Sequence, residues 1–243
     1  MHKLLLILYV ISLIGPSTIA HAQLSLGLQA GIGQNYLSTN IDKLSYTNNV
    51  SQHTPVLSLP ISYTFCSWFS LQTAITYIQK NYSLVRNGPY TGIYETFKNT
   101  YLQLPLLASF EYRHKKISGF AIMGVFAAYW VRASVKGKTP AIFTATDNTA
   151  GNDRTIETFG LSYYNEPYVF DTKRDRRYQL GWAAGGGLEY LFDKNNSIVA
   201  EISFFQSLTD KQNTYMLNQS RQFDQTSVFS LGYKYSFGRK NEK

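Results

Sequence analysis

The chain has 243 residues, a formal net charge of +8 and a mean hydropathy of −0.20, and it contains 19 Tyr, 15 Phe and one cysteine. The lone Cys66 excludes an internal disulfide, and beyond the N-terminus no apolar run reaches the ~20 residues that a membrane-spanning helix needs. Abundant aromatic residues at modest mean hydropathy fit a membrane β-barrel, whose outward side chains meet lipid and whose inward side chains meet water.

The first 22 residues have the pattern of a secretory signal peptide. Lys3 is followed by an apolar run over residues 4–14 and by Ala20-His21-Ala22, an A-x-A cleavage site. An N-terminal membrane anchor, the alternative, needs a longer run of ~20 apolar residues. We therefore expect residues 1–22 to be removed on export and residues 23–243 to form a single outer-membrane β-barrel domain.

Eight later segments alternate large apolar or aromatic residues with small or polar ones. A strand sends alternate side chains to opposite faces, so each segment predicts a strand with one apolar face. Most segments exceed the 9–11 residues that a tilted strand needs to cross a bilayer. The fifth is apolar on both faces, which makes its assignment weaker. The segments are residues 24–33, 56–65, 70–82, 100–113, 119–132, 178–192, 197–207 and 227–237.

Short and long connections alternate strictly between these segments. The short ones are residues 66–69, 114–118 and 193–196, and the long ones are residues 34–55, 83–99, 133–177 and 208–226. Outer-membrane barrels have short periplasmic turns and long extracellular loops, whereas a soluble sandwich has no reason to place every short turn at one end. The pattern predicts an all-β fold, an eight-stranded antiparallel up-and-down transmembrane β-barrel in the cell outer membrane, with both termini periplasmic.

Aromatic residues gather near both ends of the predicted strands, as expected for girdles at the two membrane interfaces. Those at the turn side are Tyr63, Phe65, Trp68, Phe69, Tyr190, Phe192, Tyr235 and Phe237. Those at the loop side are Tyr129, Trp130, Tyr178 and Trp182.

Prolines and glycines within the strands predict local features. Pro60 and Pro105 lack the N–H of a ladder hydrogen bond, so we expect a bulge at each. The run Gly185-Gly186-Gly187 lies in mid-strand with no following helix, so it is not a phosphate loop. We expect it to admit a bulky side chain in the lumen or to allow strong coiling.

Three stretches of the chain resemble the PorT-like outer-membrane β-barrel family. They are Tyr101-Leu-Gln-Leu-Pro-Leu-Leu107, Leu231-Gly-Tyr-Lys-Tyr-Ser-Phe237 and Gly27-Leu-Gln-Ala-Gly-Ile-Gly33. The resemblance implies an eight-stranded outer-membrane barrel, and the family's name-giving member is associated with protein secretion across the outer membrane. Most members have no assigned role, and no catalytic residues come with the family.

Five charged residues are predicted to face the lumen toward the periplasmic side: Glu111, Arg113, Glu189, Glu201 and Lys234. An eight-stranded barrel is just wide enough for its side chains to fill it, and an unpaired buried charge is very costly. We expect these residues to form an ion-pair network that plugs the periplasmic half of the lumen. A proton- or ion-responsive gate is the functional alternative.

The longest connection, residues 133–177, is the best functional candidate among the loops, because connections of this length are functional or disordered. It ends in the basic residues Lys173, Arg174, Arg176 and Arg177. These are candidate contacts to phosphates of lipopolysaccharide in the outer-membrane lipid, with a solvated charge run as the alternative. Residues 158–165 alternate enough to extend a strand above the membrane or to meet an envelope protein partner.

We expect no enzymatic activity, no bound metal and no cofactor. His53 and His114 fall at opposite ends of the barrel, so they cannot share a site. A lipid-modifying enzyme, the weakest alternative, would need His53 with Ser51 or Ser58 and an acid such as Asp42. Nucleic-acid binding is disfavoured because the chain is exported and its charge is spread. We expect a structural or partner-binding membrane protein with an accessory role in secretion, and a narrow channel or transport component is the main alternative.

Overall fold

The computed structural model describes residues 23–39, 46–140, 161–214 and 219–237. The predicted signal peptide lies outside these residues. The described chain contains a short 3-10 helix, η3 (Gly88–Tyr90), and ten strands. The strands are β1 (Gln23–Thr39), β2 (Thr47–Cys66), β3 (Phe69–Gln79), β4 (Tyr82–Arg86), β5 (Tyr94–His114), β6 (Ile117–Pro140), β7 (Leu161–Pro167), β8 (Tyr178–Leu191), β9 (Asn196–Ser207) and β10 (Gln222–Ser236).

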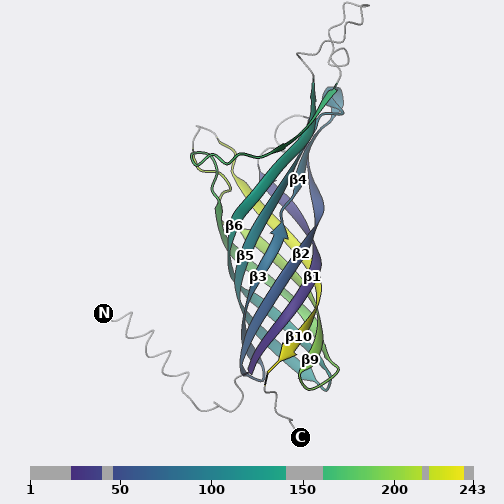
Figure 1. Cartoon of the computed structure of the whole chain (residues 1–243), viewed down its shortest axis with the longest axis vertical. Coiled ribbons are helices and arrows are strands. Elements are labelled where there is room, and N and C mark those ends of the chain that lie inside the picture. Colours follow the sequence, from purple (N-terminus) through teal and green to yellow (C-terminus); the bar gives the residue numbers. More distant parts are fainter. Residues whose placement is uncertain (1–22, 40–45, 141–160, 215–218, 238–243) are drawn as a thin grey trace, which may run out of the picture.

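Eight strands form a closed antiparallel ring in chain order, β1-β2-β3-β5-β6-β8-β9-β10, and the pairing of β10 with β1 closes it (Figure 1). The predicted eight-stranded up-and-down barrel is therefore confirmed, and each predicted segment lies wholly or mostly on one strand of the ring. The segment 70–82 runs past the end of β3 into Tyr82 of β4. The two remaining strands are additions at one end. β4 follows β3 after Lys80 and Asn81 and pairs with β2 and β5, and β7 pairs with the far end of β6.

The short connections β2–β3, β5–β6 and β8–β9 all lie at the end where β1 begins and β10 stops, at the bottom of Figure 1. There the Phe237 amide donates to the Leu24 carbonyl at 2.8 Å. We call this the turn end and the opposite one the loop end. The long connections are shorter than predicted, because β5 begins at Tyr94 and β6 runs to Pro140. Outward positions there are polar, as at Lys98, so the alternation that marks a strand in sequence is lost although the ladder continues.

Large apolar side chains cover the outside of the ring, where a membrane barrel contacts lipid. Leu28, Met123 and Ile202 are each more than half exposed. Most of the predicted girdle residues face outward with them, but the placement of Trp130 in a girdle is wrong. Its ring is 4% exposed and packs inside the barrel against Tyr101. Among the described residues, no helix has the length and apolar character needed to cross a membrane.

The expectation of a bulge at each strand proline is also wrong. β1 and β2 keep one register on both sides of Pro60, and β3 and β5 keep one register on both sides of Pro105, although the pairs at each proline are interrupted. At Pro60 a small neighbour makes room for the ring, since a Cβ at Gly27 would lie 2.9 Å from Pro60 Cγ. The register shifts occur at Thr64/Cys66 and at Thr100/Tyr101.

Candidate functional site

Inward side chains fill the barrel in three successive layers. The lower polar layer, near the turn end, consists of Glu111, Glu189, Glu201 and Lys234 with the small polar residues around them. The apolar layer above it contains the buried residues Ile122, Phe126 and Phe205, and Tyr101 and Trp130 form its edge toward the loop end. The upper polar layer lies toward the loop end and consists of Asn35, Lys80, Gln179, Asp224 and Thr226.

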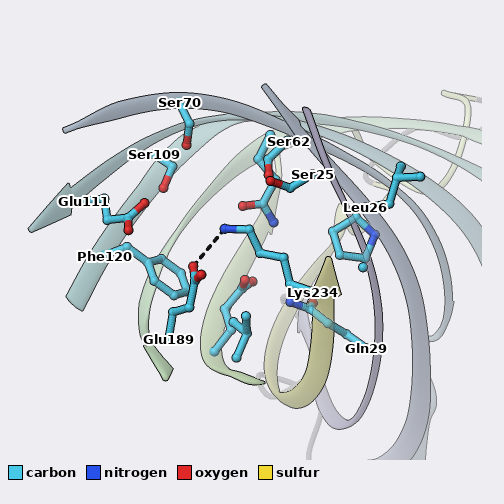
Figure 2. Close-up of a pocket in the computed structure, with 15 residues that line it drawn as sticks. Ser25, Leu26, Gln29, Ser62, Ser70, Ser109, Glu111, Phe120, Glu189 and Lys234 are labelled. Carbon is cyan, nitrogen blue, oxygen red and sulfur yellow. Dashed lines mark hydrogen bonds and ion pairs between the residues drawn. The ribbon is translucent and has the colours of Figure 1, made fainter. Parts of the chain in front are cut away.

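The lower polar layer brings together four of the five charged residues predicted for the lumen. Lys234 Nζ lies 2.8 Å from Glu189 Oε2, and the Glu189 side chain is 2% exposed. Figure 2 shows the Lys234 ammonium directed at this carboxylate, with Glu111 on the neighbouring wall. Glu201 lines the same cavity and accepts a hydrogen bond from Ser203. The fifth residue, Arg113, pairs with Glu111 from a partly exposed position beside the turn end.

The cavity between these side chains has a volume of about 30 Å³. A water molecule needs on the order of 10–15 Å³ measured in this way, so the cavity has room for only a few waters. The lower polar layer is therefore packed, with its carboxylates held by lysine, arginine and hydroxyl donors.

The apolar layer depends on β6. Its inward residues Ile122, Phe126 and Trp130 are all buried, which explains why residues 119–132 read as apolar on both faces. Phe126 meets Phe205 edge to face with ring centroids 5.6 Å apart, and Tyr101 stacks on Trp130 at 5.8 Å. Aromatic pairs at these separations contribute about 0.5–1.5 kcal/mol beyond the area they bury. The result is an apolar partition across the lumen.

Glycines on β8 make room for these rings. A Cβ at Gly187 would lie 2.6 Å from Phe120 Cζ, and a Cβ at Gly181 would lie 2.5 Å from Phe126 Cε1. Real Cβ atoms do not approach other atoms so closely. The prediction that the glycine run admits a bulky side chain of the lumen is confirmed at Gly187.

The upper polar layer is a continuous chain of hydrogen bonds. Lys80 donates to Gln179 Oε1, Gln179 Nε2 donates to Asp224 Oδ2 at 2.9 Å, and Asn35 Nδ2 donates to Asp224 Oδ1 at 3.0 Å. Thr226 Oγ1 donates in turn to Asn35 Oδ1 at 2.7 Å. The Lys80 ammonium also lies about 5 Å from the Tyr101 and Phe126 ring centroids, on top of the apolar layer. Each of the five side chains is buried.

A cavity of about 570 Å³ opens above this layer at the loop end, and we call it the mouth cavity. Five aromatic residues from β4, β5, β6, β7 and the β7–β8 connection line it. They are Tyr82, Phe97, Trp130, Tyr164 and Tyr168.

The polar lining of the mouth cavity comprises three carboxylates, Glu95, Glu166 and Asp175, together with Lys211, Gln212 and Gln222. Tyr164 donates to Glu95 at 2.8 Å, and Tyr168 donates to Asp175 at 2.9 Å. Burial and the bond to Glu95 raise the pKa of Tyr164 to about 12, so its hydroxyl remains a donor at neutral pH.

Lys211 enters the cavity lining from the β9–β10 connection. Its ammonium lies 4.8 Å from the Tyr82 ring centroid and 4.6 Å from that of Trp130. Among the described residues, neither Lys211 Nζ nor Trp130 Nε1 has a hydrogen-bond acceptor. Burial lowers the pKa of the Lys211 ammonium, while Asp224 and Asp175 oppose that shift.

The basic residues at the end of the predicted loop differ in how many contacts they make with the rest of the protein. Arg177 lies 4.5 Å from the Tyr129 ring centroid and donates to the Trp130 carbonyl at 3.0 Å. Arg174 pairs with Asp171 at 3.5 Å, Arg176 donates to Asn213, and Lys173 is exposed. Within the predicted stretch 158–165, the described part forms the start of β7, as the alternation indicated.

The residues considered for lipid hydrolysis are not brought together. His53 faces outward on β2, whereas Ser58 is buried in the lumen and pairs with Thr76 at 2.8 Å. Ser51 accepts from Gln34, and Asp42 lies outside the described residues. No group of three or more histidine, cysteine or acidic side chains within the described ranges could hold a metal ion.

Sequence reasoning missed Lys211, Asp224 and the lining of the mouth cavity. Asp224 and Lys211 fall within residues 208–226, which read as a loop. The available signal was the concentration of aromatic and acidic residues in the second half of the longest predicted loop, as at Tyr164, Glu166 and Tyr168.

Solved structures with similar folds include small outer-membrane barrels. OprG of Pseudomonas aeruginosa is 11% identical with a TM-score of 0.48, covering 89% of this chain and 97% of its own. Neisserial surface protein A is 12% identical with a TM-score of 0.43, and the match covers 86% of this chain and 96% of that protein. The attachment invasion locus protein Ail of Yersinia pestis is 12% identical with a TM-score of 0.39, and the match covers 88% of this chain and 98% of Ail. The comparison with curated protein sequences gave no match.

The family model described as "Outer membrane protein beta-barrel domain" matches residues 20–213, which is most of the chain. Together with the closed ring and its apolar outer face, this match assigns the cellular membrane. The chain belongs to the outer membrane protein beta-barrel domain family and is an integral outer-membrane β-barrel protein.

Proposed function

We propose that this protein is a closed, non-enzymatic barrel that anchors a binding surface at the extracellular side of the outer membrane. The apolar layer is the observation that carries the proposal. Phe126 and Phe205 lie across the lumen, and Lys80 of the upper polar layer lies over the Phe126 ring. An ion that crossed this layer would lose its hydration without gaining a polar partner, at a cost of many kcal/mol.

The same layer argues against the alternative of a narrow channel. The lower cavity of about 30 Å³ is separated from the mouth cavity of about 570 Å³ by buried rings. The polar residues above and below the apolar layer pair with one another, as Lys234 does with Glu189. The charged lumen residues are thus structural, and they keep the barrel filled.

In the proposed orientation, the turn end faces the periplasm and the loop end faces the exterior, because short turns are periplasmic in outer-membrane barrels. The exposed Lys173 and the neighbouring Arg174 and Arg176 then lie at the outer-leaflet side, where lipopolysaccharide phosphates are available. A role beside a secretion partner rests on the resemblance to the PorT-like family.

Planar-bilayer conductance of the purified, folded protein tests the proposal. The wild type should give no stable conductance steps. Phe126→Ala should produce them, because removing one ring of the Phe126–Phe205 pair opens the apolar layer. Phe229→Ala is the matched control, since Phe229 is a half-exposed outward residue on β10. Stable steps from the wild type that change on substitution of Glu201 or Lys234 would refute the closed barrel and favour a channel.

A further inference from the structure

We propose that the mouth cavity is a binding site for a neutral saccharide. This inference rests on the proposed function, because it names the ligand class for the extracellular binding surface. The cavity's volume of about 570 Å³ falls within the ~300–1,000 Å³ typical of small-molecule sites. Most of its lining residues lie on strands, so much of the site is preformed.

The charges of the lining favour a ligand without net charge. Three carboxylates face one ammonium, so an anion would be repelled by Glu95, Glu166 and Asp175. A cation would meet the opposite obstacle. Lys211 already places its ammonium over Tyr82 and Trp130, the aromatic faces that an organic cation would need.

The hydrogen-bonding groups favour a ligand whose polar groups both donate and accept. The carboxylates of Glu95 and Glu166 only accept, whereas Lys211 Nζ and Trp130 Nε1 only donate and have no acceptor within the described chain. A sugar hydroxyl serves both kinds of partner. The Lys211 ammonium sits on a four-carbon stem, so a small rotation brings it to a ligand oxygen.

The aromatic walls provide the remaining contact. The negative face of an aromatic ring attracts the weakly positive C–H groups that line the faces of a sugar ring. Phe97 and Tyr164 present such rings from β5 and β7, next to Glu95. Stacking surfaces beside carboxylate and amide side chains match a ligand with apolar faces and a hydroxylated edge.

Tryptophan fluorescence of the full-length protein gives a direct test. The chain has three tryptophans, and Trp68 and Trp182 face outward. Replacing these two with phenylalanine leaves Trp130 as the only emitter, at the wall of the mouth cavity. The folded reporter protein in vesicles free of lipopolysaccharide is titrated with neutral gluco-, galacto- and N-acetylglucosamine oligosaccharides of two to four sugars. Choline and a sulfated disaccharide serve as the charged comparison probes.

At least one neutral oligosaccharide should give a saturable change with a Kd below about 1 mM. Glu95→Gln combined with Glu166→Gln should weaken its binding about tenfold or more. Glu111→Gln is the matched control, because it changes the same type of side chain on β5 at the opposite end of the lumen, and it should leave the Kd unchanged. If added lipopolysaccharide with its full polysaccharide competes for the site, the natural ligand is a sugar of the membrane's own lipopolysaccharide. If it does not compete, the natural ligand is a free saccharide.

The inference is overturned if no neutral oligosaccharide binds the folded protein, or if choline or the sulfated disaccharide binds more tightly than all of them. It is also overturned if the double glutamine variant binds as the wild type does. These outcomes are separate from failure of the closed-barrel proposal, which is decided by conductance alone. If the wild type does not conduct and binds no saccharide, only the saccharide inference is refuted.

Discussion

Asp224→Asn is the most informative single change in the upper polar layer. Asp224 is 1% exposed and accepts hydrogen bonds from Asn35 and Gln179. Its carboxylate also faces the buried ammonium groups of Lys80 and Lys211. Asparagine has nearly the same shape, so the variant removes one charge and turns one acceptor into a donor facing the Gln179 amide.

The expected loss follows from two independent estimates. Each hydrogen bond to a charged group contributes about 1.5–3 kcal/mol, so weakening two of them accounts for about 3 kcal/mol or more. Removing one member of a buried charge network typically costs about 3–5 kcal/mol, because the opposite charge stays buried without compensation. We therefore expect Asp224→Asn to lower the free energy of unfolding by about 3–5 kcal/mol.

Equilibrium urea unfolding in lipid vesicles, followed by tryptophan fluorescence, measures this loss. Glu166→Gln is the control, because Glu166 is an exposed carboxylate at the same end of the barrel and should change stability by no more than about 0.5 kcal/mol. Combining Asp224→Asn with Lys80→Met should cost less than the sum of the two single changes, since the two groups are coupled. A loss below about 1 kcal/mol for Asp224→Asn, or strict additivity, would refute the reasoning.

Two further predictions concern packing and pH. Gly187→Ala should lower the free energy of unfolding by about 1–3 kcal/mol, because the new Cβ would lie 2.6 Å from Phe120 Cζ. Gly119→Ala, whose nearest contact would be 3.9 Å away, should be near neutral, and equal losses in the two urea titrations would contradict this account. Burial lowers the pKa of Lys211 in the folded protein below the ordinary lysine value of 10.5, so the unfolded chain binds more protons just below that pH. Wild-type stability should therefore gain up to about 1.4 kcal/mol per pH unit from this group in that alkaline range. Lys211→Met should remove that slope and exposed Lys173→Met should not, as unfolding titrations at several pH values would show.

The ring was predictable because its physical cause is local in sequence. Each ring strand must show alternating side chains to lipid and lumen, so a period of two identifies all eight, including the closing strand that ends at Phe237. The presence of charged side chains in the lumen was also predictable. Glu189 and Lys234 stand at inward positions of strands that the same alternation defines, and the structure pairs them at 2.8 Å.

The mouth cavity was not predictable because its lining depends on contacts between distant segments. Lys211 reaches Tyr82 and Trp130 only after the β9–β10 connection folds over the barrel end, where the Arg176 amide donates to the Lys211 carbonyl. Trp130 was misplaced for a different reason. It lies in the same phase of β6 as Ile122 and Phe126, but residues 119–132 are apolar on both faces, so the alternation does not mark which face is inward.

The two ends of the lumen differ in packing and in the strands that surround them. Near the turn end the side chains leave about 30 Å³, and a part-buried lysine–glutamate pair lies beneath the apolar layer. At the loop end the strands continue past the outward apolar band, and the chain adds β4 and β7 to build walls around about 570 Å³. A barrel that served only as an anchor would have no need of these walls, since eight strands already satisfy every ladder in the membrane. The added strands make sense if recognition takes place at the loop end while the filled lumen keeps the membrane sealed.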